Sequence, residues 1–176
     1  MQKRQNVHMQ NMRLRMMRES DLPAVAALNA AADPEVQDIG EDGLRDLLAM
    51  CDVALVATDA SGEILAFVMS LGMGHPYASE NYRWFEQRGV RHQYIDRIVV
   101  APRAKGTGLG SALYASVLER ARERGALEVT CEVNLDPPNP TSIAFHERLG
   151  FRRLAEQDTR GGTVRVALMA RGVWED

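Results

Sequence analysis

The chain has 176 residues, of which 45% are apolar and 26% are charged, a composition typical of a globular domain with one buried core. Its formal net charge of -3 gives no overall attraction for nucleic acid or for an anionic membrane. We therefore expect neither partner, and any anionic ligand must be held locally. Cys51 and Cys131 form no CxxC pair, which favours a reduced, cytoplasmic protein over a disulfide-stabilised secreted one.

The first 11 residues are polar and lack the apolar core of a signal peptide or membrane anchor. We expect residues 1–11 to be a flexible extension and residues 12–176 to form a single domain. Alternating polar and apolar residues predict a first strand over 12–17. Helical patterns follow over 19–32 and 41–50.

Two runs rich in β-branched and aromatic residues predict a hairpin over 52–73, turning at Ala60-Ser61-Gly62. Further along, the pattern predicts a strand over 94–100, a helix over 108–125 and a strand over 126–135. Because the connections are short, these two strands should be parallel, joined by a right-handed crossover. A short helix begins near Asn139 and ends near Gly150, and a hairpin over 151–170 follows.

Residues 74–93 break this regularity and concentrate aromatic side chains in what the pattern predicts to be a long loop. One interpretation is a lid or substrate wall, and the other is an aromatic plug packed on the core. Arginines in the same segment would either attract a carboxylate on a substrate or form a solvated face. The aromatic residues concerned are Tyr77, Tyr82, Trp84 and Phe85, and the arginines are Arg83, Arg88 and Arg91.

Three alternating glycines, Gly106, Gly108 and Gly110, lie between a strand and a helix. The first amides of a helix have no partner within it, and the helix dipole favours negative charge there. Residues without side chains let a phosphate approach these donors, with Arg103 and Lys105 as counter-charges. The spacing is neither GxGxxG nor a Walker A loop. The alternative is a glycine-rich turn needed only for close packing.

Two motifs carry a family resemblance. The segment VVAPRAKGTGLGSALY, residues 99–114, resembles the acetyl-CoA-binding motif of the GNAT superfamily of N-acetyltransferases, with Lys105 at its basic position. The segment NPTSIAFHERLGF, residues 139–151, resembles the second motif of that family. The motifs occur in the right order, and the order of the elements from 12 to 170 also looks like this fold.

The resemblance implies an α+β fold with a twisted, mostly antiparallel sheet of about seven strands and about four helices. One parallel pair of strands would splay apart to hold CoA. The backbone of Ile98, Val99 and Val100 would hold pantetheine, and residues 105–111 would hold the pyrophosphate. The full set of implied CoA-binding residues is Ile98, Val99, Val100, Arg103, Lys105, Gly106, Thr107, Gly108, Leu109, Gly110, Ser111, Asn139, Ser142, Phe145, His146 and Arg148.

The resemblance also implies direct attack of an amine on the thioester of acetyl-CoA within a ternary complex. An amide near Val99 or Val100 would stabilise the oxyanion. His146 stands where many relatives have a tyrosine proposed to protonate the leaving thiolate. It would either do so in its place, or pack at the helix edge and contact CoA without transferring a proton.

The attacking amine must lose a proton, and two carboxylates are candidates for the base. If the strand over 94–100 is regular, Asp96 lies on one face with Tyr94, and Glu132 faces the same gap from the next strand. A bulge would reverse this orientation. The alternative for either carboxylate is a structural ion pair with an arginine such as Arg97 or Arg148.

The sequence therefore predicts an acetyl-CoA-dependent N-acetyltransferase acting on a primary amine, of a small molecule rather than of a protein. The alternative is a non-catalytic CoA-binding regulatory module with the same fold, favoured by the missing tyrosine. We expect no metal, and a homodimer is plausible because many relatives pair. The catalytic candidates are His146, Asp96 and Glu132, and the acceptor-binding candidates are Tyr77, Tyr82, Trp84, Phe85 and Tyr94.

Overall fold

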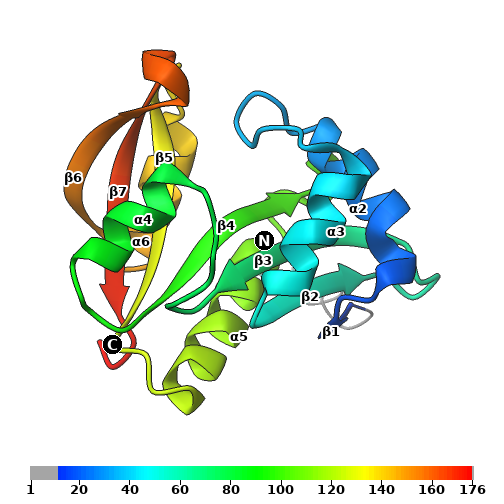
Figure 1. Ribbon diagram of the computed structural model, residues 1–176. Helices are drawn as coiled ribbons and strands as arrows, with labels where there is room; N and C mark the ends of the chain where they lie inside the picture. Colours follow the sequence, from blue (N-terminus) through cyan, green and yellow to red (C-terminus); the bar gives the residue numbers. More distant parts are fainter. Residues whose placement is uncertain (1–11, 176) are drawn as a thin grey trace. The chain divides into compact units, whose positions relative to one another are not determined.

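The computed structural model describes residues 12–175, so the predicted N-terminal extension, 1–11, lies outside the described residues. Seven strands form one sheet in the order β1-β2-β3-β4-β5-β7-β6, with β4 and β5 parallel (Figure 1). The mixed sheet and its parallel pair confirm the predicted fold class. The strands are β1 (Arg13–Met16), β2 (Val53–Thr58), β3 (Ile64–Leu71), β4 (His92–Val100), β5 (Glu128–Asp136), β6 (Arg152–Thr159) and β7 (Val164–Gly172). The α-helices are α2 (Leu22–Ala30), α3 (Gly40–Met50), α4 (Glu80–Gln87), α5 (Leu109–Glu123) and α6 (Pro140–Arg148).

The chain divides into two compact units, and β3, β4 and α5 each contribute to both. Among the described residues, the first unit contains 12–69 together with Arg97–Ser116. The second contains Ser70–Asp96 and residues 117–175.

In the first unit, β1 pairs antiparallel with β2, and α2 packs against α3. Leu22 and Leu44 of these helices are fully buried. The β2–β3 turn is closed by the Asp59 carboxylate, which accepts the amide of Ser61 at 2.9 Å. Gly62 completes this turn with a φ of 89°, a conformation that side chains rarely adopt. The turn thus lies where the sequence predicts it.

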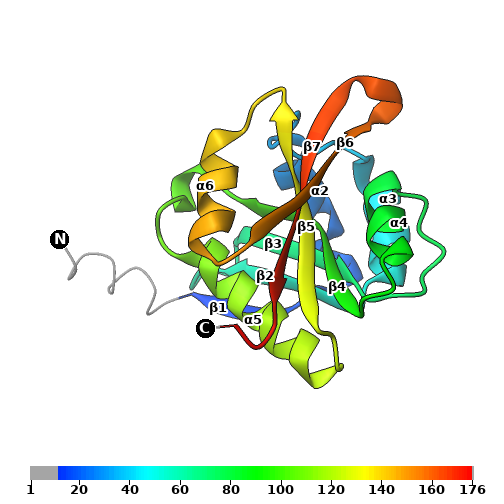
Figure 2. The same ribbon diagram turned by 90° about the vertical axis from the view of Figure 1, so that its left-hand side faces the viewer.

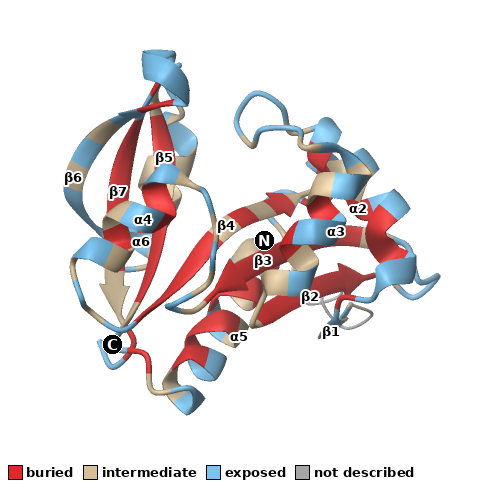
Figure 3. Ribbon diagram, viewed as in Figure 1, coloured by how far each residue is buried: buried red, intermediate tan, exposed pale blue. Residues whose placement is uncertain are grey.

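In the second unit, β5 is parallel to β4 on one side and antiparallel to β7 on the other. Helices α4 and α6 lie on opposite faces of the β5–β7 pair in both views (Figures 1 and 2). Figure 3 shows β5 and β7 largely buried, whereas the edge strand β6 is largely exposed. The core of this unit therefore lies between the two helices.

Helix α4 is a correction to the predicted long loop, and it makes five α-helices where about four were expected. Ser79 caps it by accepting the amide of Tyr82 at 3.2 Å. The aromatic residues of α4 that are buried in the core are Tyr82 and Phe85, which lie one turn apart. Two residues in a helix this short give too little periodicity for the sequence pattern to register.

Candidate functional site

The glycine segment forms a tight connection into α5. A short 3-10 turn over Pro102–Ala104 is followed by Gly106 with a φ of 78° and Gly108 with a φ of 89°. The Ala112 amide donates to the Gly108 carbonyl at 3.0 Å and so begins the hydrogen bonding of the helix. The amides of residues 109–111 precede it and have no acceptor in an ideal helix. The segment therefore offers grouped donors suited to an anion.

The two basic residues of this segment differ in their surroundings. Arg103 forms an ion pair with Glu63, and both side chains are more than half exposed. Lys105 is exposed beside Gly106. The Thr107 hydroxyl donates to the Ala104 carbonyl at 2.6 Å, which stabilises the turn before α5. Arg103 is thus already paired with a carboxylate, whereas Lys105 is an exposed positive charge next to the glycines.

A second group of polar residues lies in the second unit, on β4, β5 and the segment before α4. The Tyr94 hydroxyl donates to Glu132 Oε2 at 2.7 Å. The Tyr77 hydroxyl donates to Asp96 Oδ1 at 2.5 Å. Ser79 Oγ lies 3.5 Å from the Tyr94 hydroxyl. The structure therefore brings together four predicted site residues: Tyr94 with Glu132, and Tyr77 with Asp96.

The carboxyl of Glu132 is the most perturbed acid of this group. Glu132 keeps part of its surface in solvent, but its carboxyl lies among protein atoms. Loss of solvation is the largest cause that raises its pKa to about 8, and the charge of Asp96 adds to it. Hydrogen bonds from Tyr94 and Asn81 oppose the rise. Glu132 is therefore a carboxyl that exchanges a proton near neutral pH.

Burial also acts on Tyr94, whose side chain is fully enclosed. Its pKa is raised well above its ordinary value, first by burial and then by the charges of Glu132 and Asp96. The hydroxyl therefore stays protonated and serves Glu132 as a donor. Sequence reasoning placed Tyr94 among acceptor-binding residues and missed this contact, because the register of β4 against β5 is fixed only in the folded sheet.

The arginines named as alternative ion-pair partners lie as follows. Arg97 Nη1 donates to Asn29 Oδ1 at 2.9 Å and to the Gln37 carbonyl at 3.1 Å, both in the first unit. Arg148 is exposed near the end of α6. The base and ion-pair interpretations of Asp96 and Glu132 both stay predictions.

The aromatic residues of segment 74–93 divide between core and surface. Tyr82 and Phe85 are 1% and 0% exposed and pack edge-on or tilted against Tyr94, with centroids 5.5 and 5.9 Å away. This favours the plug interpretation for these two. Tyr77 and Trp84 are half-buried. Arg88 pairs with Glu128 and lies 5.7 Å from the Trp84 ring, so it is engaged within the protein.

Phe85→Ala tests the plug interpretation. Removing a fully buried phenylalanine should lower the free energy of unfolding by about 3–5 kcal/mol. Trp84→Ala, at a half-buried position of the same helix, should cost distinctly less. Denaturant unfolding of both variants checks this, and equal losses would contradict the assignment of Phe85 to the core.

His146 lies on α6 and is 4% exposed. Its Nδ1 lies 2.7 Å from the Ser142 carbonyl, which makes Nδ1–H the donor, and the rings of Phe145 and Phe151 lie 5.4 Å from its ring. Burial lowers its pKa below the ordinary 6.5, so the ring is neutral at neutral pH. This environment favours the packing interpretation over proton donation to a thiolate.

This burial predicts a pH dependence of stability. The unfolded chain binds a proton at His146 below about pH 6.5, and the folded protein does so only at lower pH. The free energy of unfolding should therefore fall as the pH drops below 6.5. His146→Gln, whose amide can still donate to Ser142, should reduce this slope. Urea unfolding between pH 7 and pH 5 measures it, and an unchanged slope would contradict a buried neutral imidazole.

The start of α6 has the helix cap that the sequence predicts. The Asn139 side chain accepts the Ser142 amide at 3.2 Å and caps the helix, and Pro140 occupies its first turn. Gly150 follows α6 with a φ of 86°. The strand residues named for pantetheine, Ile98, Val99 and Val100, complete β4, and the next amide, Ala101, donates to the Leu65 carbonyl at 2.8 Å.

Residues 12–175 contain no helix long and apolar enough to cross a membrane. No group of three or more His, Cys, Asp or Glu side chains in the same residues could hold a metal ion.

Comparison with known proteins identifies relatives. A methionine sulfoximine/methionine sulfone acetyltransferase of Pseudomonas aeruginosa is 33% identical over 97 residues, 55% of this chain and 49% of that protein. A mycothiol acetyltransferase of Saccharomonospora viridis is 33% identical over 138 residues, 74% of this chain and 42% of that protein. The chain thus spans half or less of the length of these relatives.

Solved structures share the fold. The phosphinothricin acetyltransferase of Sinorhizobium meliloti, solved in complex with acetyl-CoA, superposes with a TM-score of 0.69 at 19% identity, covering 92% of this chain and 88% of that one. The sequence model of the Acetyltransferase (GNAT) family matches residues 20–151, which include both motifs up to Phe151. The chain therefore belongs to the GNAT family of acetyltransferases.

Proposed function

We propose that this protein transfers an acetyl group from acetyl-CoA to the primary amine of a small molecule, with Glu132 as the base. The observation that carries the proposal is Glu132 itself: a carboxyl with a pKa of about 8, oriented by Tyr94, in a chain of the GNAT family. A base that titrates near the working pH is suited to removing the proton of an amine.

Acetyl-CoA would be held first through its pyrophosphate. The donors are the amides at the start of α5, with the exposed Lys105 as counter-charge. The acetyl-CoA complex of the Sinorhizobium meliloti enzyme, which has the same fold, supports this choice of cosubstrate. The backbone of Ile98–Val100 would bind the pantetheine arm.

In the reaction, the amine nitrogen forms a bond to the thioester carbonyl carbon, and the carbon–sulfur bond then breaks. Glu132 accepts the proton that the amine loses, and the CoA sulfur leaves as a thiolate. The amide of Val99 or Val100 would stabilise the oxyanion. We assign no proton donation to His146, because a buried neutral ring bonded to Ser142 is held in α6, and a thiolate leaves readily without an acid.

The acceptor is proposed to be a small amine because the two relatives above are named as a methionine sulfoximine/methionine sulfone acetyltransferase and a mycothiol acetyltransferase. Release of free CoA thiol from acetyl-CoA should be measured across amino acids, polyamines, aminoglycosides and short peptides. We expect release with at least one small amine and little with peptides.

The same panel tests the alternative of a non-catalytic module. Tight acetyl-CoA binding with no thiol release for any amine would overturn the enzyme and favour the module. If neither acetyl-CoA nor CoA raised the melting temperature, both would be contradicted, because ligand at 100 times its dissociation constant should add about 2.7 kcal/mol.

A further inference from the structure

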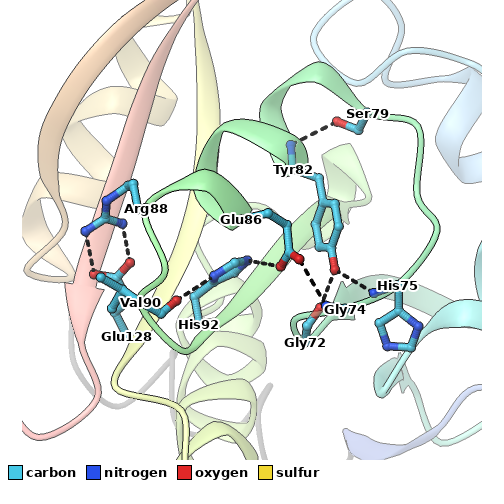
Figure 4. A network of polar contacts seen from close by, with 10 residues as sticks. All are labelled: Gly72, Gly74, His75, Ser79, Tyr82, Glu86, Arg88, Val90, His92 and Glu128. Atoms are coloured by element: carbon cyan, nitrogen blue, oxygen red, sulfur yellow. Dashed lines mark hydrogen bonds and ion pairs between the residues drawn. The ribbon is translucent and has the colours of Figure 1, made fainter.

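The segment between β3 and α4, residues 72–79, is fixed to α4 by three hydrogen bonds (Figure 4). The Tyr82 hydroxyl donates to the Gly72 carbonyl at 2.8 Å and accepts the His75 amide at 3.0 Å. The Glu86 carboxylate accepts the Gly74 amide at 3.1 Å. One helix thus holds three of four successive residues of an otherwise exposed segment, which has no regular secondary structure of its own.

Tyr82 is suited to this task because its ring cannot move. The ring is 1% exposed and lies edge-on against Tyr94 and His92, with centroids 5.5 and 6.0 Å away. Its hydroxyl extends from this packed ring to the backbone of the segment. The hydroxyl acts both as a donor and as an acceptor, and both of these hydrogen bonds are to backbone groups of the same segment.

The fixed segment leads directly to Tyr77, whose ring packs on Tyr82 with centroids 5.7 Å apart. The Tyr77 hydroxyl donates to Asp96 Oδ1 at 2.5 Å, a short hydrogen bond. The charge of Asp96 in turn favours the protonated form of Glu132.

We propose that Tyr82 is a positioning residue: by bridging Gly72 and His75 it holds the Tyr77 hydroxyl on Asp96, and Tyr77 thereby fixes the Asp96 carboxylate beside Glu132. Without the Tyr77 hydroxyl, Asp96 would lose the hydrogen bond that fixes its carboxylate in this position. This role rests on the proposed function only in taking Glu132 as the base.

Tyr82→Phe removes the hydroxyl and keeps the ring, so the packing of α4 is preserved. Amide hydrogen exchange at residues 72–77 should accelerate about tenfold, since one well-made hydrogen bond accounts for a change of that order. Tyr114→Phe is the matched control, because it also removes the hydroxyl of a buried tyrosine, which lies on α5 and is 1% exposed. This variant should leave exchange at 72–77 unchanged. Unchanged exchange in Tyr82→Phe would overturn the proposal.

Activity supplies the second readout. Tyr82→Phe should lower kcat by about fivefold to tenfold and move the rising limb of the kcat–pH profile to lower pH, as should Tyr77→Phe, because the Asp96 charge that raises the pKa of Glu132 is then held less firmly beside it. Because Tyr82 acts through Tyr77, adding Tyr82→Phe to Tyr77→Phe should change kcat by less than about twofold. Additive losses with an unmoved limb would show a merely structural effect and overturn the positioning role.

Glu132→Gln separates this inference from the function on which it rests. If Glu132→Gln loses activity while Tyr82→Phe keeps the wild-type rate and pH profile, only the positioning role is wrong. If Glu132→Gln keeps the wild-type rate, the proposed base is wrong and the positioning role is overturned with it. Accelerated exchange in Tyr82→Phe would then show that the Tyr82 hydrogen bonds stabilise the segment without contributing to catalysis.

Discussion

Glu132→Gln is expected to lower kcat about 10²–10⁴-fold, the usual contribution of a general base. Glutamine has the same shape and can still accept from Tyr94, so acetyl-CoA affinity should stay within about twofold of wild type. The wild-type kcat should rise with pH up to about 8, where Glu132 becomes ionised, and this limb should be absent from the variant. Steady-state kinetics between pH 6 and pH 9 measure both effects.

The same substitution should change stability in the opposite direction to activity. The pKa of Glu132 is about 8 in the folded protein against an ordinary 4.5, so wild-type stability is lost as the pH rises from 4.5 through 8. Glu132→Gln removes this loss and should be more stable than wild type above pH 8. A variant that is inactive but less stable at that pH would indicate a structural ion pair instead of a poised base.

Gly108→Ala is expected to weaken acetyl-CoA binding by about tenfold or more. Gly108 has a φ of 89° directly before α5, where a side chain strains the backbone by about 1–2 kcal/mol and lies among the anion donors. Losing one hydrogen bond to a charged group is worth about 1.5–3 kcal/mol, which corresponds to about 10–100-fold in affinity. Isothermal titration calorimetry with acetyl-CoA measures the change.

Gly62→Ala is the matched control for backbone strain. Gly62 has the same φ of 89°, lies in the β2–β3 turn of the same unit, and has open space around the position of a Cβ. The two variants should lose similar stability, but Gly62→Ala should bind acetyl-CoA as tightly as wild type. Equal affinities in the two variants would contradict the role of residues 105–111 in holding the pyrophosphate.

The crossover from β4 through α5 to β5 could be predicted because its signals are local. The helix carries its apolar residues at helical spacing, and Gly125 follows it with a φ of 74°. The cap of α6 by Asn139 is equally local. Each of these features is encoded within a few residues of where it acts, and the structure has it where the sequence predicts it.

Helix α4 and the choice of base could not be predicted, because both depend on contacts between distant segments. The sequence offers Asp96 and Glu132 as equals, since each alternates correctly on its strand. What separates them is their hydrogen-bond donors: Tyr77 donates to Asp96, and Tyr94 and Asn81 donate to Glu132. Asn81 lies 51 positions from Glu132 in the sequence. Burial, which sets the pKa of Glu132, is likewise a property of the packed unit.

Acetyl transfer is tested most directly by following the acetyl group itself. The protein is mixed with acetyl-CoA labelled in the acetyl carbonyl and with the best amine of the panel, and the products are separated and identified by mass spectrometry and NMR. We predict the label in an amide of the acceptor, with one CoA thiol released per amide formed. Thiol release with the label in free acetate, or no transfer while acetyl-CoA binds tightly, would contradict an N-acetyltransferase.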